Sequence, residues 1–323
     1  METNNKNKDL RKDGLTVLSL CDGMSCGHIA LERAGFKVKK YFASEIKDIA
    51  IKVTKENYPD TIHVGDVNKI TYENGVLHTE NGDFETDIDL VIFGSPCQSF
   101  SIAMKTEHRI GLEDKEKSGL SLECYRILKE VNPKYFLMEN VASMKDEDRD
   151  VITDLMGVEP IMIDSALVAP CLRKRYYWTN IPGVQQPEDK HITFQSVLDE
   201  GYTNREKGVA LLVSDCRPTT TPVKMFHRYH RKSFTNLIFK SKEHYEKCVE
   251  YYDSHYKNMK AKDIPVGETD VFDGVRFMNQ TETERCQTVP EGYTKCLTRN
   301  EAADVLGDGW TVDVIAHIFS FMK

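Results

Sequence analysis

Apolar and β-branched runs alternate with stretches of helical periodicity along the first 141 residues of the chain. Five runs are typical of buried strands: residues 16–20, 37–46, 61–67, 89–94 and 135–141. Three stretches carry apolar residues at helical spacing: residues 27–36, 47–59 and 120–131. Strands that alternate with helices form βαβ units. The pattern therefore predicts an α/β fold with a doubly wound, mostly parallel sheet and helices on both faces.

One segment interrupts this alternation. Residues 71–85, "TYENGVLHTENGDFE", contain two "ENG" triplets. An Asn-Gly pair is typical of the tight turn that joins two antiparallel strands. The segment therefore predicts a β-hairpin between the third and fourth strands of the sheet.

Polar side chains follow all five predicted strands at the point where each strand ends. They are Asp22-Gly23, Ser44-Glu45, Gly65-Asp66, Ser95-Pro96-Cys97 and Glu139-Asn140. A single carboxylate in such a place is usually a solvated loop residue or a helix cap. Five sets in succession point instead to a ligand site, because the carboxyl ends of parallel strands meet at one edge of the sheet.

The turn after the first strand, "CDGMSCG", argues against two common ligands of this fold class. It lacks the G-x-G-x-x-G fingerprint of dinucleotide-binding proteins, and without Lys-Ser/Thr it is not a phosphate-binding P-loop. An acid at the end of the second strand, Glu45, suits a ribose diol. An acid after the third strand, Asp66, suits the amino group of adenine. Ribose and adenine without phosphates, together with tolerance of a cation, indicate S-adenosylmethionine.

Composition narrows the class of protein. The chain has 323 residues with 40% hydrophobic and 29% charged residues, which is typical of a globular protein. Nine cysteines without a C-x-x-C pair indicate reduced thiols and a cytosolic setting, and no metal site is expected. The polar start, "METNNKNKDLRKDG", is not a signal peptide, and no apolar run approaches the ~18 residues of a membrane helix.

A local excess of positive charge stands out against the net charge of −8. Residues 223–247 hold seven Lys or Arg against two Glu, with three His and five aromatic residues between them. This mixture fits phosphate contact plus reading of base edges in a nucleic-acid groove. The alternative is a solvated basic helix face.

Several motifs, in this order, resemble those of the DNA cytosine C5 methyltransferases: "LSLCDGMSCG", "ASEI", "VGDV", "GSPCQSFS", "MENV", "RKRYYWTN" and "GDGWTVDVI". The resemblance runs from about Thr16 to the C-terminus. The compact arrangement is most similar to the catalytic domain of eukaryotic de novo DNA methyltransferases, and a stand-alone bacterial or viral member fits equally. The family implies the class I S-adenosylmethionine-dependent methyltransferase fold, with a small target-recognition region.

The resemblance implies a reaction in which a methyl group passes from S-adenosylmethionine to C5 of a cytosine flipped out of duplex DNA. Cys97 is implied as the nucleophile that adds to C6, so that C5 becomes enamine-like. Glu139 is implied to contact N3 and the exocyclic amine of the base. Arg173 and Arg175 resemble the family's Q-x-R-x-R element, with Arg173 at O2 of the base. Alternation in a strand would place both arginines on one face.

Each of these residues also has a purely structural interpretation. Cys97 would then be a packed, inert thiol, Glu139 a helix cap, and the two arginines a solvated basic turn. Two alternative functions also stay open at this point. One is methylation of C5 in an RNA, such as tRNA, by the same scaffold. The other is a catalytically silent DNA-binding homologue.

The resemblance also implies ligand contacts. For the cofactor they are Asp22, Gly23, Met24, Cys26, Gly27, Glu45, Ile46, Asp66, Val67, Gly94, Pro96 and Trp310. For DNA they are Ser99, Ile102 and Lys105 at the start of a long loop, then Thr220, Lys224, Arg228, Arg231 and Lys232. The chain departs from the family's usual pattern at Cys21, Cys171 and Gly309, which bears on cofactor affinity. Without a polar side chain at Gly309, only main-chain contacts and Trp310 are expected there.

The sequence predicts four regions: a polar leader at 1–14, a catalytic and cofactor-binding domain at 15–215, a target-recognition region at 216–276, and a segment at 277–323 that returns to the catalytic domain. The expected location is the cytoplasm, in association with the nucleoid, in a prokaryotic or viral host. In a eukaryote the expected location is the nucleus.

Overall fold

A computed structural model describes residues 9–94, 120–211, 221–231, 235–264 and 270–323. The chain divides into two compact units. The first unit comprises Met1–Asp164, Lys174–Pro187 and Val312–Lys323, and the second comprises Ser165–Arg173 and Glu188–Thr311. The second unit is therefore larger than the target-recognition region expected at 216–276, and the last twelve residues return to the first unit.

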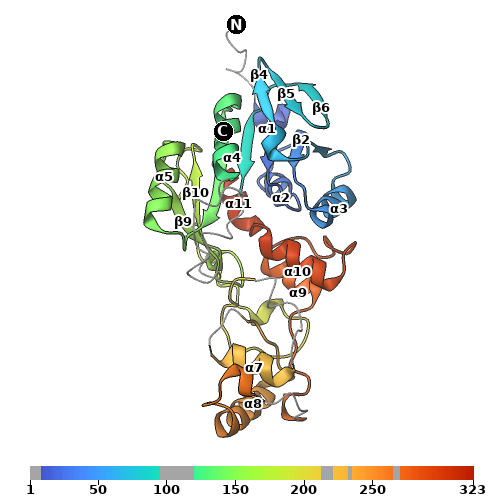
Figure 1. Cartoon of the computed structure of the whole chain (residues 1–323), viewed down its shortest axis with the longest axis vertical. Coiled ribbons are helices and arrows are strands. Elements are labelled where there is room, and N and C mark those ends of the chain that lie inside the picture. Colours follow the sequence, from blue (N-terminus) through green and yellow to red (C-terminus); the bar gives the residue numbers. More distant parts are fainter. Residues whose placement is uncertain (1–8, 95–119, 212–220, 232–234, 265–269) are drawn as a thin grey trace. The chain divides into compact units, whose positions relative to one another are not determined.

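A seven-stranded sheet forms the centre of the first unit (Figure 1). Its strands are β1 (Leu15–Leu20), β2 (Val38–Ser44), β3 (Ile62–His63), β7 (Leu90–Phe93), β8 (Tyr135–Val141), β9 (Ile161–Asp164) and β10 (Lys174–Thr179). Their order across the sheet is β3-β2-β1-β7-β8-β10-β9. The first five are parallel neighbours, whereas β10 runs antiparallel to both β8 and β9. The predicted α/β fold with a mostly parallel sheet is confirmed.

Helices cover this sheet. They are α1 (Leu10–Asp13), α2 (Cys26–Arg33), α3 (Asp48–Asn57), α4 (Leu120–Val131), α5 (Asp146–Met156) and α11 (Val312–Phe319). Every residue of β1 is buried, which requires cover on both faces of the sheet. On one face, Leu18 and Phe42 share a core cluster with Ile127 of α4 and Ile152 of α5. Helix α11 packs against α2, so the C-terminal segment completes the unit.

The segment predicted as a hairpin is a three-stranded antiparallel sheet, formed by β4 (Thr71–Glu73), β5 (Val76–Thr79) and β6 (Gly82–Glu85). It is coloured cyan in Figure 1. The first turn is Asn74-Gly75, with φ of 53° and 83°. Positive φ at both central residues matches the twist of the flanking strands, which explains the Asn-Gly pair. Both "ENG" triplets therefore mark turns, and the expected hairpin was one strand too short. The short helix η1 (Val67–Lys69) connects β3 to this sheet.

The second unit is largely helical. Its elements are α7 (Pro222–His230), α8 (Lys242–His255), α9 (Gln280–Cys286), α10 (Arg299–Asp308) and the short helices η4 (Ser165–Leu167), η5 (Gln195–Val197), η6 (Ala261–Asp263) and η7 (Asp270–Phe272). An aromatic core holds α7 and α8 together, with the Phe226 ring 5.4 Å from Tyr252 and 5.2 Å from Phe272.

The aromatic residues of the basic segment 223–247 correct one expectation. Phe226 and Phe239 are 0% and 1% exposed, and Tyr229 is buried beside them. They form the core of the second unit. Phe226 and Tyr229 lie on the inward face of α7, and Phe239 contacts both rings from outside this helix. Interleaving of aromatic and basic residues was therefore evidence of an amphipathic helix, not of aromatic side chains exposed for base contact.

Candidate cofactor and catalytic site

The turn after β1 brings Asp22 to the end of β2. Cys21, Gly23 and Ser25 have φ of 53°, 63° and 61°, so the chain turns sharply within five residues. The main-chain N–H of Asp22 donates to the carbonyl of Ser44 over 2.9 Å. The Asp22 carboxylate accepts from the Ser25 hydroxyl over 2.5 Å and from the Tyr41 hydroxyl over 2.7 Å. The carboxylate is therefore fixed by two hydroxyl donors.

Burial raises the pKa of the Asp22 carboxyl to about 6, since desolvation disfavours the charged form. Hydrogen bonds from Ser19, Ser25 and Tyr41 favour the carboxylate and oppose this shift, whereas the negative charge of Glu45 adds to it. Two acids therefore lie close enough at this edge to influence each other.

This raised pKa predicts a pH-dependent stability. As the pH rises from about 4 to 6, the unfolded chain loses the Asp22 proton before the folded chain does, so the folded state becomes less stable. The free energy of unfolding of Asp22→Asn, taken relative to that of the unsubstituted protein, should therefore be about 2 to 3 kcal/mol higher at pH 7 than at pH 4. Urea unfolding at both pH values measures the change. The exposed Asp60→Asn variant is the control, and a pH-independent difference for Asp22→Asn would contradict the prediction.

Glu45 links the ends of β1 and β2. Its carboxylate accepts hydrogen bonds from the main-chain N–H groups of Gly23 over 2.8 Å, Ile46 over 2.8 Å and Lys47 over 2.9 Å. The neighbouring Ile46 side chain is 72% exposed, although it is apolar. The structure thus brings Asp22, Gly23, Glu45 and Ile46 together at the carboxyl edge of the sheet.

Asp66 lies at the next strand end. The Ser44 hydroxyl donates to the carbonyl of Gly65 over 2.8 Å, so the ends of β2 and β3 are also connected. Asp66 caps η1, with its Oδ1 accepting from the main-chain N–H of Asn68 over 3.0 Å. The three strand ends that carry Asp22, Glu45 and Asp66 therefore form one hydrogen-bonded edge.

Other expected cofactor residues lie in the interior. Met24, Cys26 and Val67 are 0%, 3% and 4% exposed, so their side chains pack in the core of the first unit. Gly27 is buried within α2. Any ligand contact by these residues would use main-chain atoms. Trp310 belongs to the second unit.

Glu139 and Arg175 form a second pair at the same sheet edge. Glu139 lies near the end of β8 and is 8% exposed. Its Oε1 is 2.7 Å from Nε of Arg175, which lies on the adjacent antiparallel strand β10. Tyr177 is directly opposite Glu139, so Arg175 is the diagonal neighbour on the same face. A buried carboxylate is thereby neutralised and oriented by one guanidinium group.

Arg173 does not share the position of Arg175. It precedes β10 and belongs to the second unit, where its Nη2 donates to the carbonyl of Gly309 over 2.9 Å. The side chain of Gln287 donates to the same carbonyl over 3.3 Å. The expected alternation of Arg173 and Arg175 in one strand is wrong, because the strand begins at Lys174. The main chain of Gly309 serves to anchor Arg173.

The pairing of Glu139 predicts the effect of removing its charge. For the methyl transfer to DNA that the sequence resemblance implies, Glu139→Gln keeps the size of the side chain but should lower the rate by about 10²- to 10⁴-fold, the range for loss of acid–base assistance. Single-turnover transfer of a labelled methyl group to duplex DNA measures this rate. Glu123→Gln is the matched control, because Glu123 also contacts an arginine, Arg126, over 3.0 Å on α4. An unchanged rate for Glu139→Gln would contradict the prediction.

Seven of the expected site residues lie outside the described residues: Pro96, Cys97, Ser99, Ile102, Lys105, Thr220 and Lys232. The described strand β7 ends at Phe93, and Gly94 is the last described residue before this segment. The roles expected for these residues therefore stay predictions.

The described basic residues of α7 differ in their surroundings. Lys224 and Arg228 are half-buried, and Arg231 is exposed. The guanidinium of Arg231 donates to the carbonyls of Lys257 over 3.2 Å and Met259 over 3.3 Å. Arg231 therefore has a structural role as the cap of α7 and a tether for the segment after α8.

Sequence reasoning missed residues that hold the site together. Tyr41 lies inside β2 and Thr54 inside α3, yet Tyr41 contacts Asp22, and Thr54 contacts Ser25 over 2.9 Å. Nothing in their local sequence marks them.

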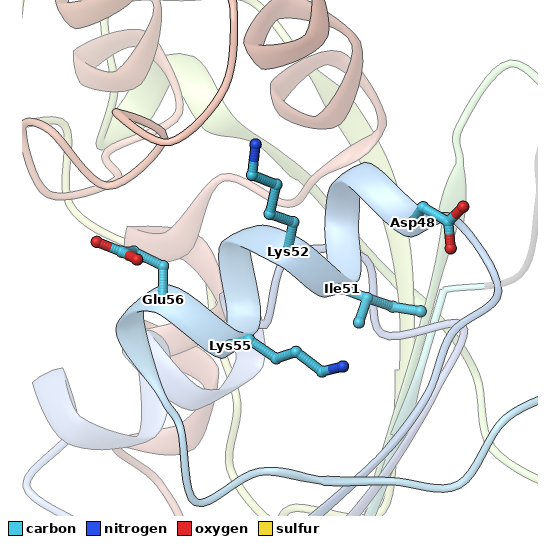
Figure 2. A pocket seen from close by; sticks show the side chains of 5 residues that line it. All are labelled: Asp48, Ile51, Lys52, Lys55 and Glu56. Atoms are coloured by element: carbon cyan, nitrogen blue, oxygen red, sulfur yellow. The ribbon is translucent and has the colours of Figure 1, made fainter.

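A hollow of about 380 Å³ lies elsewhere, along the outer side of α3, and Figure 2 shows the side chains that line it. They are Asp48, Ile51, Lys52, Lys55 and Glu56, none of which was an expected site residue.

Comparison with known proteins relates the N-terminal part of the chain to one family. Residues 15–156 match the model of the C-5 cytosine-specific DNA methylases. The type II methyltransferase M.NlaIV of Neisseria lactamica is 39% identical over 147 residues, which cover 44% of this chain and 31% of that protein. The chain thus matches about a third of the length of this relative.

Two solved structures share the fold along almost the whole chain. A DNMT2 variant of Spodoptera frugiperda has a TM-score of 0.61 at 17% identity and covers 95% of this chain and 99% of its own. The methyltransferase EhMeth of Entamoeba histolytica has a TM-score of 0.62 at 16% identity, covering 95% and 97%. At sequence identities of 16% and 17%, the similarity to these structures establishes the fold alone.

In the part of the chain that the structure describes, His, Cys, Asp and Glu side chains form no cluster that could hold a metal ion. None of the helices described there combines the length and the apolar character needed to cross a membrane.

Proposed function

We propose that the chain is a DNA cytosine C5 methyltransferase that uses S-adenosylmethionine. The observation that carries the proposal is the hydrogen-bonded edge of the sheet, where Asp22, Glu45 and Asp66 lie at successive strand ends within a C-5 cytosine-specific DNA methylase domain. Glu139 lies at the end of another parallel strand of this sheet.

The hydrogen-bond acceptors at this edge suit S-adenosylmethionine. Carboxylates of Glu45 and Asp66 suit the ribose hydroxyls and the adenine amino group, and the exposed Ile46 side chain offers an apolar surface for the purine. Asp22 provides a negative group that tolerates a cationic ligand. When bound, S-adenosylmethionine supplies the methyl group.

The chain's own residues would then act on the base. The Cys97 thiolate adds to C6 of a flipped cytosine, and this bond makes C5 nucleophilic. Glu139, held by Arg175 at 2.7 Å, contacts the exocyclic amine and N3, and a proton shared between its carboxyl group and N3 compensates the negative charge that the thiolate brings to the ring. Arg173 contacts O2 of the base. Once C5 carries the methyl group, a base removes the proton from C5, the electrons of that bond re-form the C5–C6 double bond, and the C6–S bond breaks to release the Cys97 thiolate.

Duplex DNA is the proposed substrate. With a net charge of −8, the molecule needs a local positive surface to approach phosphates. Lys224 and Arg228 on α7 are the described candidates for this contact, and the second unit that contains them is the proposed target-recognition unit. Contacts to phosphate would make binding weaken steeply with salt.

The test compares acceptors. The full chain is incubated with labelled S-adenosylmethionine and either duplex DNA or unmodified tRNA, and the products are digested and separated as nucleosides. We expect 5-methyl-2′-deoxycytidine from DNA. 5-Methylcytidine from tRNA alone would instead support the RNA methyltransferase alternative. No transfer to either acceptor, despite cofactor binding, would support the catalytically silent homologue.

A further inference from the structure

The turn between β5 and β6 contacts the loop that follows β3. Glu80 Oε1 accepts a hydrogen bond from the main-chain N–H of Asp66 over 2.8 Å, and its Oε2 is 2.5 Å from Nζ of Lys69. Asn81, the second residue of the turn, donates from Nδ2 to the carbonyl of His63 over 3.0 Å. The turn therefore holds the loop at both ends, at His63 and at Asp66.

Gly65 allows this close approach. Its φ is +78°, and a Cβ at this position would lie 2.0 Å from Oε1 of Glu80. A residue with a side chain is therefore excluded while Glu80 packs against the backbone. The Ser44 hydroxyl donates to the carbonyl of Gly65 over 2.8 Å, so the loop is bonded to Ser44 as well as to Glu80.

The turn is itself fixed to the core of the first unit. Leu77 of β5 is 0% exposed and belongs to the core cluster of the large sheet. The Phe84 ring packs edge-on against Phe42 of β2, with ring centres 5.3 Å apart. Since both strands beside the turn are anchored, Glu80 contacts the loop from a rigid support.

We infer that Glu80 is a positioning residue for the purine end of the cofactor site, and that it sets the preference of this chain for a 6-amino purine by fixing the main chain of Asp66. This inference rests on the proposed function, because it takes S-adenosylmethionine as the cofactor and Asp66 as the acceptor for its amino group. Glu80 acts through Asp66. Its side chain is 32% exposed and comes from the small sheet, outside the expected motifs.

The charge of Glu80 contributes to this role. The hydrogen bonds from Lys69 and from the main chain of Asp66 lower the pKa of the Glu80 carboxyl, so it is a carboxylate at neutral pH. A carboxylate is a stronger acceptor for a main-chain N–H than a neutral oxygen. Removing it leaves the Asp66 N–H without this acceptor and Lys69 without this partner.

The test measures ligand discrimination by calorimetry, without turnover. The full chain is titrated with S-adenosylhomocysteine and with S-inosylhomocysteine, which lacks the 6-amino group. We expect the unsubstituted protein to prefer the adenosyl compound about tenfold or more, the value of one hydrogen bond to a charged acceptor. Glu80→Ala should reduce this preference to about threefold or less. Glu80→Gln retains an oxygen for the Asp66 N–H and should preserve most of the preference.

The controls separate positioning from stability. Glu85→Gln alters an exposed carboxylate of the same small sheet and should leave both dissociation constants unchanged. If Glu80→Ala weakens both ligands by the same factor, or changes neither, the inference is overturned while the proposed function stands. If the unsubstituted protein binds neither ligand, the proposed function fails first and the inference fails with it.

Discussion

Cys97→Ser is expected to abolish methyl transfer to DNA, with a loss of about 10⁴- to 10⁶-fold, the scale for removing a covalent nucleophile. A thiol with a pKa of about 8.5 is partly ionised near neutral pH and is strongly nucleophilic as the thiolate, whereas a serine hydroxyl is a weak nucleophile without a base beside it. In the described structure, β7 lies between β1 and β8 and ends at Phe93, four residues before Cys97 in the sequence. Single-turnover assays with labelled cofactor measure the loss.

A trapping experiment tests the covalent step separately. In duplex DNA that contains 5-fluorocytosine, C5 carries fluorine in place of the proton that must leave after methyl transfer. Cys97 then cannot be eliminated from C6, so the unsubstituted protein should form a complex that survives denaturing electrophoresis. Cys97→Ser should form none, although its affinity for S-adenosylhomocysteine should stay within about twofold. Cys296→Ser, which alters a half-buried thiol of the second unit, is the control and should behave as the unsubstituted protein. Methylation by Cys97→Ser at a comparable rate would refute a thiolate mechanism.

Periodicity was sufficient to locate the elements that carry the site. The predicted strand at 135–141 and helix at 120–131 coincide with β8 and α4. These elements have one strong pattern each, a continuous buried run or an apolar stripe, and the core of the first unit needs both. The strand ends that carry Asp22, Glu45 and Asp66 were also predicted correctly to converge, because a parallel sheet brings the carboxyl ends of its strands to one edge.

The contacts between those residues could not be predicted in the same way. The partner of Glu139 is Arg175, on a strand that lies next to β8 only because β10 runs antiparallel to it. Arg173, two residues earlier, contacts Gly309 instead. Glu80 reaches Asp66 from a separate sheet. Each pairing depends on strand order and register, which long-range folding determines and local sequence does not encode.

Local sequence also failed to show which residues of the basic segment 223–247 lie close together in space. The mixture of basic and aromatic residues in 223–247 was interpreted as fitting nucleic-acid contact, but Phe226, Tyr229 and Phe239 pack around Tyr252 and Phe272 in the core. A period of 3.6 residues puts apolar and basic side chains on opposite faces of one helix, so their proximity in sequence says little about their proximity in space. Lys224 and Arg228 remain the described candidates for phosphate contact.

Arg276→Ala is expected to destabilise the second unit by about 3 to 5 kcal/mol, the cost of leaving a buried charge without its partner. Arg276 holds Glu282 in a two-point contact, with Nη1–Oε2 at 2.7 Å and Nη2–Oε1 at 2.8 Å. Glu282 is 0% exposed, and its carboxylate also accepts from the main-chain N–H groups of Asn279 and Asp199. One ion pair thus fixes the start of α9, and the residue that follows this helix, Gln287, donates to the carbonyl of Gly309.

The measurement should follow the second unit alone. The chain has two tryptophans, Trp178 in the first unit and Trp310 in the second, so Trp178→Phe leaves Trp310 as the fluorescent reporter of the second unit. In that background, Arg276→Ala should lower the urea midpoint. Arg285→Ala is the control, because its partners Asp199 and Glu291 are 41% and 62% exposed and stay solvated when the arginine is removed. Its expected cost is about 1 kcal/mol or less. Equal losses for the two variants would show that burial of Glu282 does not determine the cost, and that the Arg276 pair contributes no more than a surface contact.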